Sequence, residues 1–225
     1  MSHPSIINRL IIKDIRLNAV PLGLYFIVGL IGLGLLTVES KGPFYAGSVI
    51  LLSMIIVAGA HLVTVTVNTE RSDQTLAFIL SLPITFNQYS HAKVCANLMT
   101  FLGFWLLLYL GMVMVIYSQA AIPNGLLVYA TILMLELFAV FVLVLSVGLI
   151  SESQNWTIVV MSITNICLSM FMFWLSSIEG IRANIEAAAP VWNAAALQIV
   201  AAEFAFVLAC LAITYWLQSR KRDFL

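Results

Sequence analysis

The chain alternates between long apolar runs and polar connections, most of which are short. Six runs reach the length of about 20 residues that a helix needs to cross a bilayer. They cover residues 20–38, 45–67, 94–117, 125–150, 156–178 and 195–217. Most connections are rich in Gly, Pro, Ser and Asn, as is typical of turns. The pattern predicts an all-α integral membrane protein, with six transmembrane helices in one domain over residues 1–225.

Composition supports this fold class. Hydrophobic residues make up 62% of the chain and charged residues 9%, whereas soluble domains carry about a quarter charged residues. We therefore expect the outer surface of the helices to contact membrane lipid. Basic residues form no cluster with interleaved aromatics, so we expect no nucleic-acid partner. The three cysteines, Cys95, Cys167 and Cys210, are widely spaced in or beside apolar runs, which favours packing over disulfide or metal chemistry.

Basic residues predict the orientation of the chain in the membrane. An even number of spans places both termini on one side, and Lys and Arg gather on the cytoplasmic side of membrane proteins. Two of the ten basic residues, Lys41 and Arg182, fall on the side opposite the termini. The other eight are Arg9, Lys13, Arg16, Arg71, Lys93, Arg220, Lys221 and Arg222. We therefore expect cytoplasmic termini and no cleaved signal peptide.

Two segments outside the spans have helical periodicity. Residues 1–19 carry isoleucines every four positions, at Ile7, Ile11 and Ile15, with basic residues on another face. This pattern predicts an interfacial amphipathic helix. Residues 176–193 place Ile178 and Ile181 three apart before Pro190. They predict one or two short amphipathic helices at the external surface.

Small residues indicate where helices pack closely in lipid. Glycines crowd the first span, and alanines form a stripe at helical spacing in the last span. They are Gly23, Gly29, Gly32, Gly34, Ala201, Ala205 and Ala209. These stripes predict packing seams, within one chain or across a dimer.

Ionisable residues inside the spans are candidates for function. Glu136 and Glu203 lie in spans four and six, where a charge costs about 3 kcal/mol on insertion scales and so usually faces protein or water. They are candidates for a translocation path or a proton relay. The alternative is that each is protonated or hydrogen-bonded to a neighbouring helix, with Asn165 as one potential partner. For His61, in span two, a role in packing is the favoured interpretation.

Motifs for catalysis are not found in the sequence. The chain contains no Gly-Lys-Ser or Gly-Lys-Thr, the end of the loop that binds nucleotide phosphates. His3, His61 and His91 lack the i, i+4 spacing of a zinc helix. The sequence also lacks a matching motif for a Ser/His or paired-Asp hydrolase. The chain is therefore not expected to be an enzyme by itself, and no cofactor is expected in it.

The long polar connection at residues 69–93 reads NTERSDQTLAFILSLPITFNQYSHAK from Asn68 to Lys93. Ser72 or Asp73 can cap a helix N-terminus, and Pro83 ends that helix. Its apolar side consists of Leu76, Phe78, Ile79 and Leu80. A second helix then leads through Lys93 into span three. By itself, the segment would be a short amphipathic helix on the inner leaflet.

This loop resembles that of the permease subunits of type-2 ATP-binding-cassette (ABC) exporters. In that family an acid-rich start precedes a Thr-Leu helix, then Leu-Leu-x-Leu-Pro, Ser or Thr, and a downstream Lys. The matching positions here are Glu70, Asp73, Thr75, Leu76, ILSLP at 79–83, Thr85 and Lys93. Gln74 departs from the pattern, because a glycine is common there. The basic lead-in, the six spans and the external segment also resemble the family's architecture.

The resemblance implies a function and a set of partners. Residues 70–83 would form a coupling helix that docks on a separate ABC ATPase subunit, which would bind the ATP and Mg. The coupling residues would be Glu70, Arg71, Asp73, Thr75, Leu76, Ile79, Leu80 and Pro83. A second permease chain, identical or a sister, would complete a dimeric exporter in the bacterial inner membrane.

Two other classes of protein remain as alternatives to this interpretation. One is a proton-coupled secondary transporter or channel that uses Glu136 and Glu203. The other is an intramembrane enzyme, which would need paired polar catalytic groups. The transported substrate is left open by the sequence.

Overall fold

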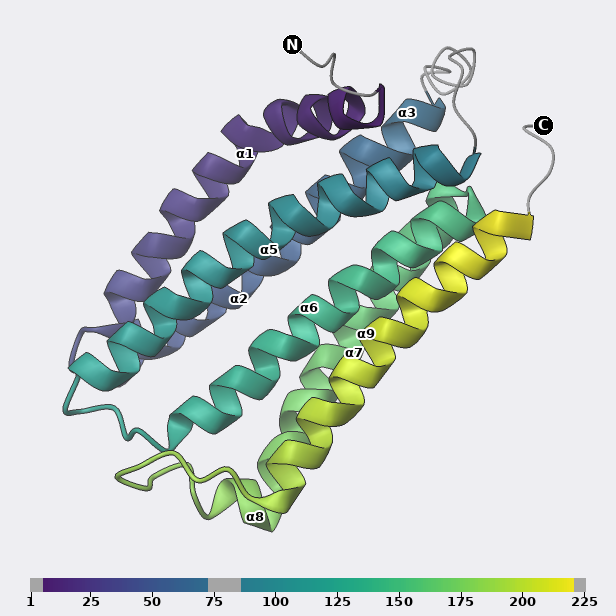
Figure 1. The fold of residues 1–225 in the computed structure, drawn as a ribbon. Coiled ribbons are helices and arrows are strands. Elements are labelled where there is room, and N and C mark those ends of the chain that lie inside the picture. The colour runs from purple at the N-terminus through teal and green to yellow at the C-terminus, as the bar shows by residue number, and fades with distance from the viewer. Residues whose placement is uncertain (1–5, 73–85, 221–225) are drawn as a thin grey trace, which may run out of the picture.

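The computed structural model describes residues 6–72 and 86–220. Within these ranges the chain forms helices joined by short turns, and no strand occurs there (Figure 1). The helices are α1 (Ile6–Leu36), α2 (Lys41–Val63), the π-helix η1 (Thr64–Asn68), α3 (Thr69–Ser72), α5 (Phe86–Ser118), α6 (Leu126–Ser151), α7 (Gln154–Ser177), α8 (Glu179–Arg182) and α9 (Ala194–Arg220). The all-α prediction is confirmed for the described part of the chain.

Six of the described helices are long and apolar enough to cross a membrane: α1, α2 with its continuation, α5, α6, α7 and α9. Each overlaps one of the six predicted spans. Large apolar side chains stay exposed on them, including Val20 and Phe173, which are 74% and 78% exposed. Such a surface suits contact with lipid. The first turn of α1 and the last turn of α9 lie at the same end of the bundle (Figure 1).

The lead-in at residues 1–19 does not form a separate helix in its described part. Residues 6–36 form one continuous helix, α1, which contains Pro21 and bends partway along its length (Figure 1). Proline removes one backbone donor and commonly bends a helix without ending it. The predicted basic face is exposed at Arg9, Lys13 and Arg16. The inward face carries polar residues as well as apolar ones, which the isoleucine pattern did not predict.

The predicted loop at residues 69–93 is largely helical at its described ends. Span two continues through η1 and α3 to Ser72, and α5 begins at Phe86 and runs unbroken into span three. The prediction of a helix leading through Lys93 is confirmed. Most of the predicted coupling residues lie outside the described residues, namely Asp73, Thr75, Leu76, Ile79, Leu80 and Pro83, as does Gln74.

The bundle is organised as two groups of helices, with α1, α2 and α5 in one and α6, α7 and α9 in the other (Figure 1). A continuous apolar core joins the groups and includes Leu51, Phe101, Leu108 and Leu145. Within the first group, α1 and α2 approach closely where glycine faces glycine. A Cβ built on Gly47 would lie 2.6 Å from the carbonyl oxygen of Gly32. The predicted packing seam therefore exists at Gly32.

The other predicted small-residue stripe does not pack within the chain. Ala201, Ala205 and Ala209 are all exposed on α9, while Glu203 and Val207 face the protein. The spacing correctly placed the three alanines on one face of the helix, but it did not determine whether other helices of the chain cover that face.

In the external segment, α8 is a single helical turn followed by turns, and Ile181 is its buried residue.

Candidate functional site

Four charged side chains meet in a ring of alternating sign at the end of the bundle where α1 begins. The ammonium of Lys93 lies 2.7 Å from Oδ2 of Asp14 and 2.7 Å from Oε2 of Glu70. The ammonium of Lys13 lies 2.6 Å from Oε1 of Glu70 and 3.3 Å from Oδ1 of Asp14. Each cation therefore contacts both carboxylates. We refer to Lys13, Asp14, Glu70 and Lys93 as the charge ring.

Three members of the charge ring are buried. Lys93 is fully buried, and Asp14 and Glu70 are 3% and 9% exposed, while the side chain of Lys13 is 47% exposed. Tyr89 covers the ring, donating from its hydroxyl to Glu70 at 3.3 Å and placing its aromatic face 5.6 Å from the Lys93 ammonium. Removing charges from water costs several kcal/mol per ion unless partners compensate. The pairing explains how these charges can be buried.

Helical spacing presents Asp14 to the interior. Leu10, Asp14 and Asn18 are the buried positions of the first turns of α1 and lie four residues apart, so they share one face. Leu10 packs against Tyr89 and Ala92 of α5 in a small apolar cluster beside the ring. This cluster holds α1 against α5, and so brings Asp14 to Lys93.

A π-helix precedes Glu70 and is held against α5. In η1 the hydroxyl of Thr66 donates to the carbonyl oxygen of Leu62, and the Asn97 amide donates to that hydroxyl at 2.8 Å. The same amide donates to the carbonyl oxygen of Lys93. π-Helical turns are rare in proteins, but those that do occur are often found at functional sites. Here the turn lies directly before α3, where Glu70 joins the charge ring.

The electrostatic environment keeps Glu70 ionised. Burial alone would raise the pKa of its carboxyl, but the ammonium groups of Lys93 and Lys13 outweigh burial and hold the pKa below its ordinary value of 4.5. An acid beside two cations behaves in this way because the cations favour its charged form. Glu70 is thus a structural anion in the site.

Of the residues predicted to couple to an ATPase, Glu70 and Arg71 lie in the described part of the chain. Glu70 was expected to act in coupling, and it lies in the charge ring; Arg71 lies beside it in α3. Asp14, Lys13 and Tyr89 were missed as members of a site. The available signal was the position of Asp14 as the only acid in a basic lead-in, four residues from both Leu10 and Asn18. No local pattern connects it with Lys93, which is 79 residues away.

The intramembrane glutamates occupy facing helices. Glu203 is a buried residue of α9, and neither of its carboxyl oxygens has a hydrogen-bond partner among the described residues. Glu136 on α6 is partly buried. The helices that carry them, α6 and α9, pack together. The fold therefore places the two predicted candidates on neighbouring helices.

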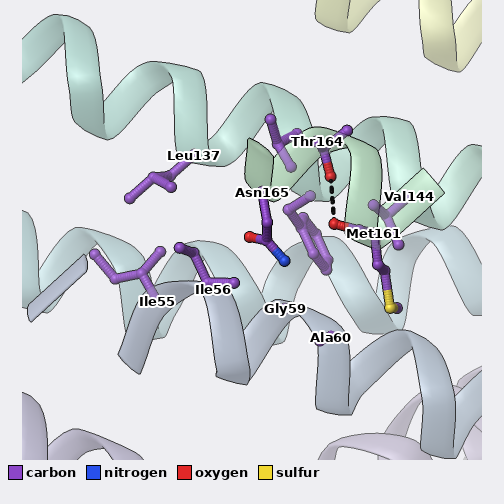
Figure 2. A pocket seen from close by; sticks show the side chains of 11 residues that line it. Ile55, Ile56, Gly59, Ala60, Leu137, Val144, Met161, Thr164 and Asn165 are labelled. Atoms are coloured by element: carbon purple, nitrogen blue, oxygen red, sulfur yellow. Dashed lines mark hydrogen bonds between the residues drawn. The ribbon is translucent and has the colours of Figure 1, made fainter. Parts of the chain in front are cut away.

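His61 and Asn165 contact other groups. His61 lies beside Tyr25, with 3.4 Å between the Tyr25 hydroxyl and Nδ1 of the imidazole. Asn165, suggested as a glutamate partner, makes no hydrogen bond with Glu203. Its amide points into a cavity of about 40 Å³ between α2, α6 and α7, near Gly59 (Figure 2). A cavity needs about 10–15 Å³ per water, so this one has room for water beside the amide.

In the described part of the chain, no group of three or more His, Cys, Asp or Glu residues is placed to hold a metal ion. No family model, curated protein or solved structure matched the chain significantly.

Proposed function

We propose that this chain is the membrane-spanning permease subunit of an ATP-driven exporter of the type-2 ABC class. Six apolar helices and the loop motif quoted above support this proposal. Two copies, or this chain and a sister chain, would form the translocation path. Separate ATPase subunits would bind ATP and Mg on the cytoplasmic side of a bacterial inner membrane.

The observation that carries the proposal is the position of the charge ring. Glu70 lies shortly before residues 73–85, and Lys93 lies shortly after them, while Asp14 and Lys13 belong to α1. A force on the segment 73–85 would act on α3, which precedes the segment, and on α5, which follows it. The charge ring would transmit the force from these helices to α1. Breaking a buried ion pair costs about 3–5 kcal/mol, so these helix ends would move together.

In this mechanism, ATP would drive transport because the ATPase subunits bind two states of the permease with different free energies. ATPase subunits that close on ATP would favour one position of the segment 73–85 over the other, and the charge ring would pass that preference to the spans. An equilibrium shifts only as far as the two states differ in binding free energy. No catalytic residue is needed in this chain.

The test is to co-purify the chain with a candidate ABC ATPase subunit and to replace Leu76 and Leu80 by Asp. Charges on the apolar side of the docking helix should abolish complex formation, because a groove that accepts leucine leaves a charge unpaired. Ala183→Asp, at an exposed position at the opposite end of the bundle, is the control and should leave the complex intact. An intact, coupled complex in the Leu76 and Leu80 variants would refute the docking assignment.

The second candidate is a proton-coupled secondary transporter, and the environment of Glu203 favours it. A buried carboxyl without a hydrogen-bond partner, on a helix that packs against the helix of a second carboxyl, is suited to exchanging protons within a membrane. This candidate predicts transport in proteoliposomes under a pH gradient with no ATPase present. It also predicts that Glu203→Gln and Glu136→Gln abolish the coupled proton flux, measured with a pH-sensitive dye.

The two candidates differ in their energy source. Transport that requires ATP and the partner ATPase, and that persists after the pH gradient is collapsed with an ionophore, would support the exporter. Transport by this chain alone under a pH gradient would support the secondary transporter.

A further inference from the structure

Two cavities adjoin at the end of the bundle opposite the first turn of α1. They lie where α1 ends, α2 begins, α5 ends and α6 begins. The cavities share Leu36, Phe44, Tyr45, Ile122 and Leu126 in their walls. Because they share these walls, they can act as two chambers of one site.

The first chamber is apolar and has a volume of about 290 Å³. Ligand pockets in proteins begin at about 300 Å³. Its walls include Leu51, Leu133 and the three methionines Met112, Met134 and Met172. Methionine side chains adapt to the shape of an apolar ligand because they are flexible and polarizable.

Two of the hydroxyls that line this chamber have backbone partners. Ser48 donates to the carbonyl oxygen of Phe44, and Tyr129 donates to that of Met172. These bonds leave the chamber suited to a hydrocarbon group rather than to a sugar or a nucleotide, which would need donors and acceptors of its own satisfied.

The second chamber has a volume of about 490 Å³ and is lined by charged and polar groups. Two carboxylates, Glu39 and Glu186, and one ammonium, Lys41, line it together with the amide of Gln119. Carboxylates outnumber the ammonium, so the chamber favours a cation over an anion.

Aromatic rings stand at the boundary between the chambers. Phe44 and Tyr45 belong to both walls, and their ring centroids are 6.1 Å apart in an edge-to-face arrangement. Aromatic faces attract cations, and quaternary ammonium groups are recognised in this way. This feature also favours a positive headgroup.

We propose that the two chambers form one binding site for a single-chain amphiphile with a cationic headgroup, of the alkylammonium class. The chain enters the apolar chamber, and the headgroup lies between Phe44, Tyr45 and the carboxylates of Glu39 and Glu186. The site does not depend on ATP coupling, so its failure would leave the proposed exporter function untouched.

The test uses the full chain in lipid nanodiscs and a dodecylammonium probe with a photoreactive group at the end of its chain. Labelled residues are identified by mass spectrometry. We expect label on residues of the apolar chamber, with competition by dodecyltrimethylammonium but not by laurate, which has a comparable chain and the opposite charge. Equal competition by laurate, or label spread over the lipid-facing surface, would overturn the proposal.

Variants test the two chambers separately. Ala130→Phe fills the apolar chamber and should abolish its labelling, whereas Ala46→Phe, on an exposed position of α2 outside the lining, is the matched control and should keep it. Replacing both Glu39 and Glu186 by Gln should weaken competition by dodecyltrimethylammonium about tenfold. These two side chains are exposed, so that variant remains informative if Ala130→Phe fails to fold. Unchanged competition in the Glu39 and Glu186 variant would overturn the assignment of the headgroup.

Discussion

The ammonium of Lys93 lies 2.7 Å from the carboxylate of Asp14, although 79 residues separate the two in the chain. The contact joins the N-terminal turns of α5 to those of α1. Both side chains are buried, so neither charge can exchange its partner for bulk water.

Lys93→Met should destabilise the protein strongly. The substitution keeps an apolar stem but leaves Asp14 without its buried cation, which costs about 3–5 kcal/mol. The measurement is the free energy of unfolding in mixed micelles. Lys13→Met is the matched control, because the side chain of Lys13 is 47% exposed and a partly solvated pair contributes about 1 kcal/mol or less. Equal losses in the two variants would contradict the assigned burial.

The charge ring should make stability sensitive to acid through Glu70. The folded protein holds the pKa of Glu70 below its ordinary value of 4.5, so the unfolded chain takes up the proton first as pH falls. Its contribution is complete above that ordinary value and is lost as pH falls through the lowered pKa. The measurement compares the Tm of the wild type with that of Glu70→Gln from neutral pH to below pH 4.5. The difference between them should shrink in acid, and a constant difference would disprove the linkage.

Gly47→Ala should weaken the packing of α1 on α2. The added Cβ would lie 2.6 Å from the carbonyl oxygen of Gly32. The backbones of α1 and α2 must move apart to relieve this clash. We expect a loss of about 1–3 kcal/mol, as for other overpacked sites, measured by thermal unfolding in nanodiscs. Gly42→Ala, on the same helix with nothing within 4 Å of the added atom, is the control and should not destabilise. A stable Gly47→Ala variant would mean that the two helices are farther apart.

Glu203→Met should stabilise the protein while removing any function of the carboxyl. Neither carboxyl oxygen has a hydrogen-bond partner in the described structure, and an unsatisfied buried polar group costs about 1–3 kcal/mol. A rise in Tm together with loss of transport would indicate that the glutamate is kept for activity. Glu186→Gln, at an exposed position, controls for the change of charge and should leave the Tm unchanged. A fall in the Tm of Glu203→Met would show that the carboxyl has a stabilising partner.

The sequence by itself determined the class of fold and the positions of the spans. A run of apolar residues long enough to cross a bilayer is a local property, because in lipid each helix satisfies its own backbone. For the same reason α6, at Leu126–Ser151, lies within one residue of the predicted span 125–150. The loop motif also predicted a role for Glu70 in coupling, and this stays a prediction.

Only the tertiary structure decided which residues meet. Asp14 looked like one acid in a basic helix, and its partnership with Lys93 depends on how α1 packs against α5. Similarly, Ala201, Ala205 and Ala209 form a stripe that the sequence could place on one helical face but not against a neighbour, and they are exposed in this chain. Periodicity describes a single helix, whereas burial and ion pairing depend on how several helices meet, and that information is spread over the whole chain.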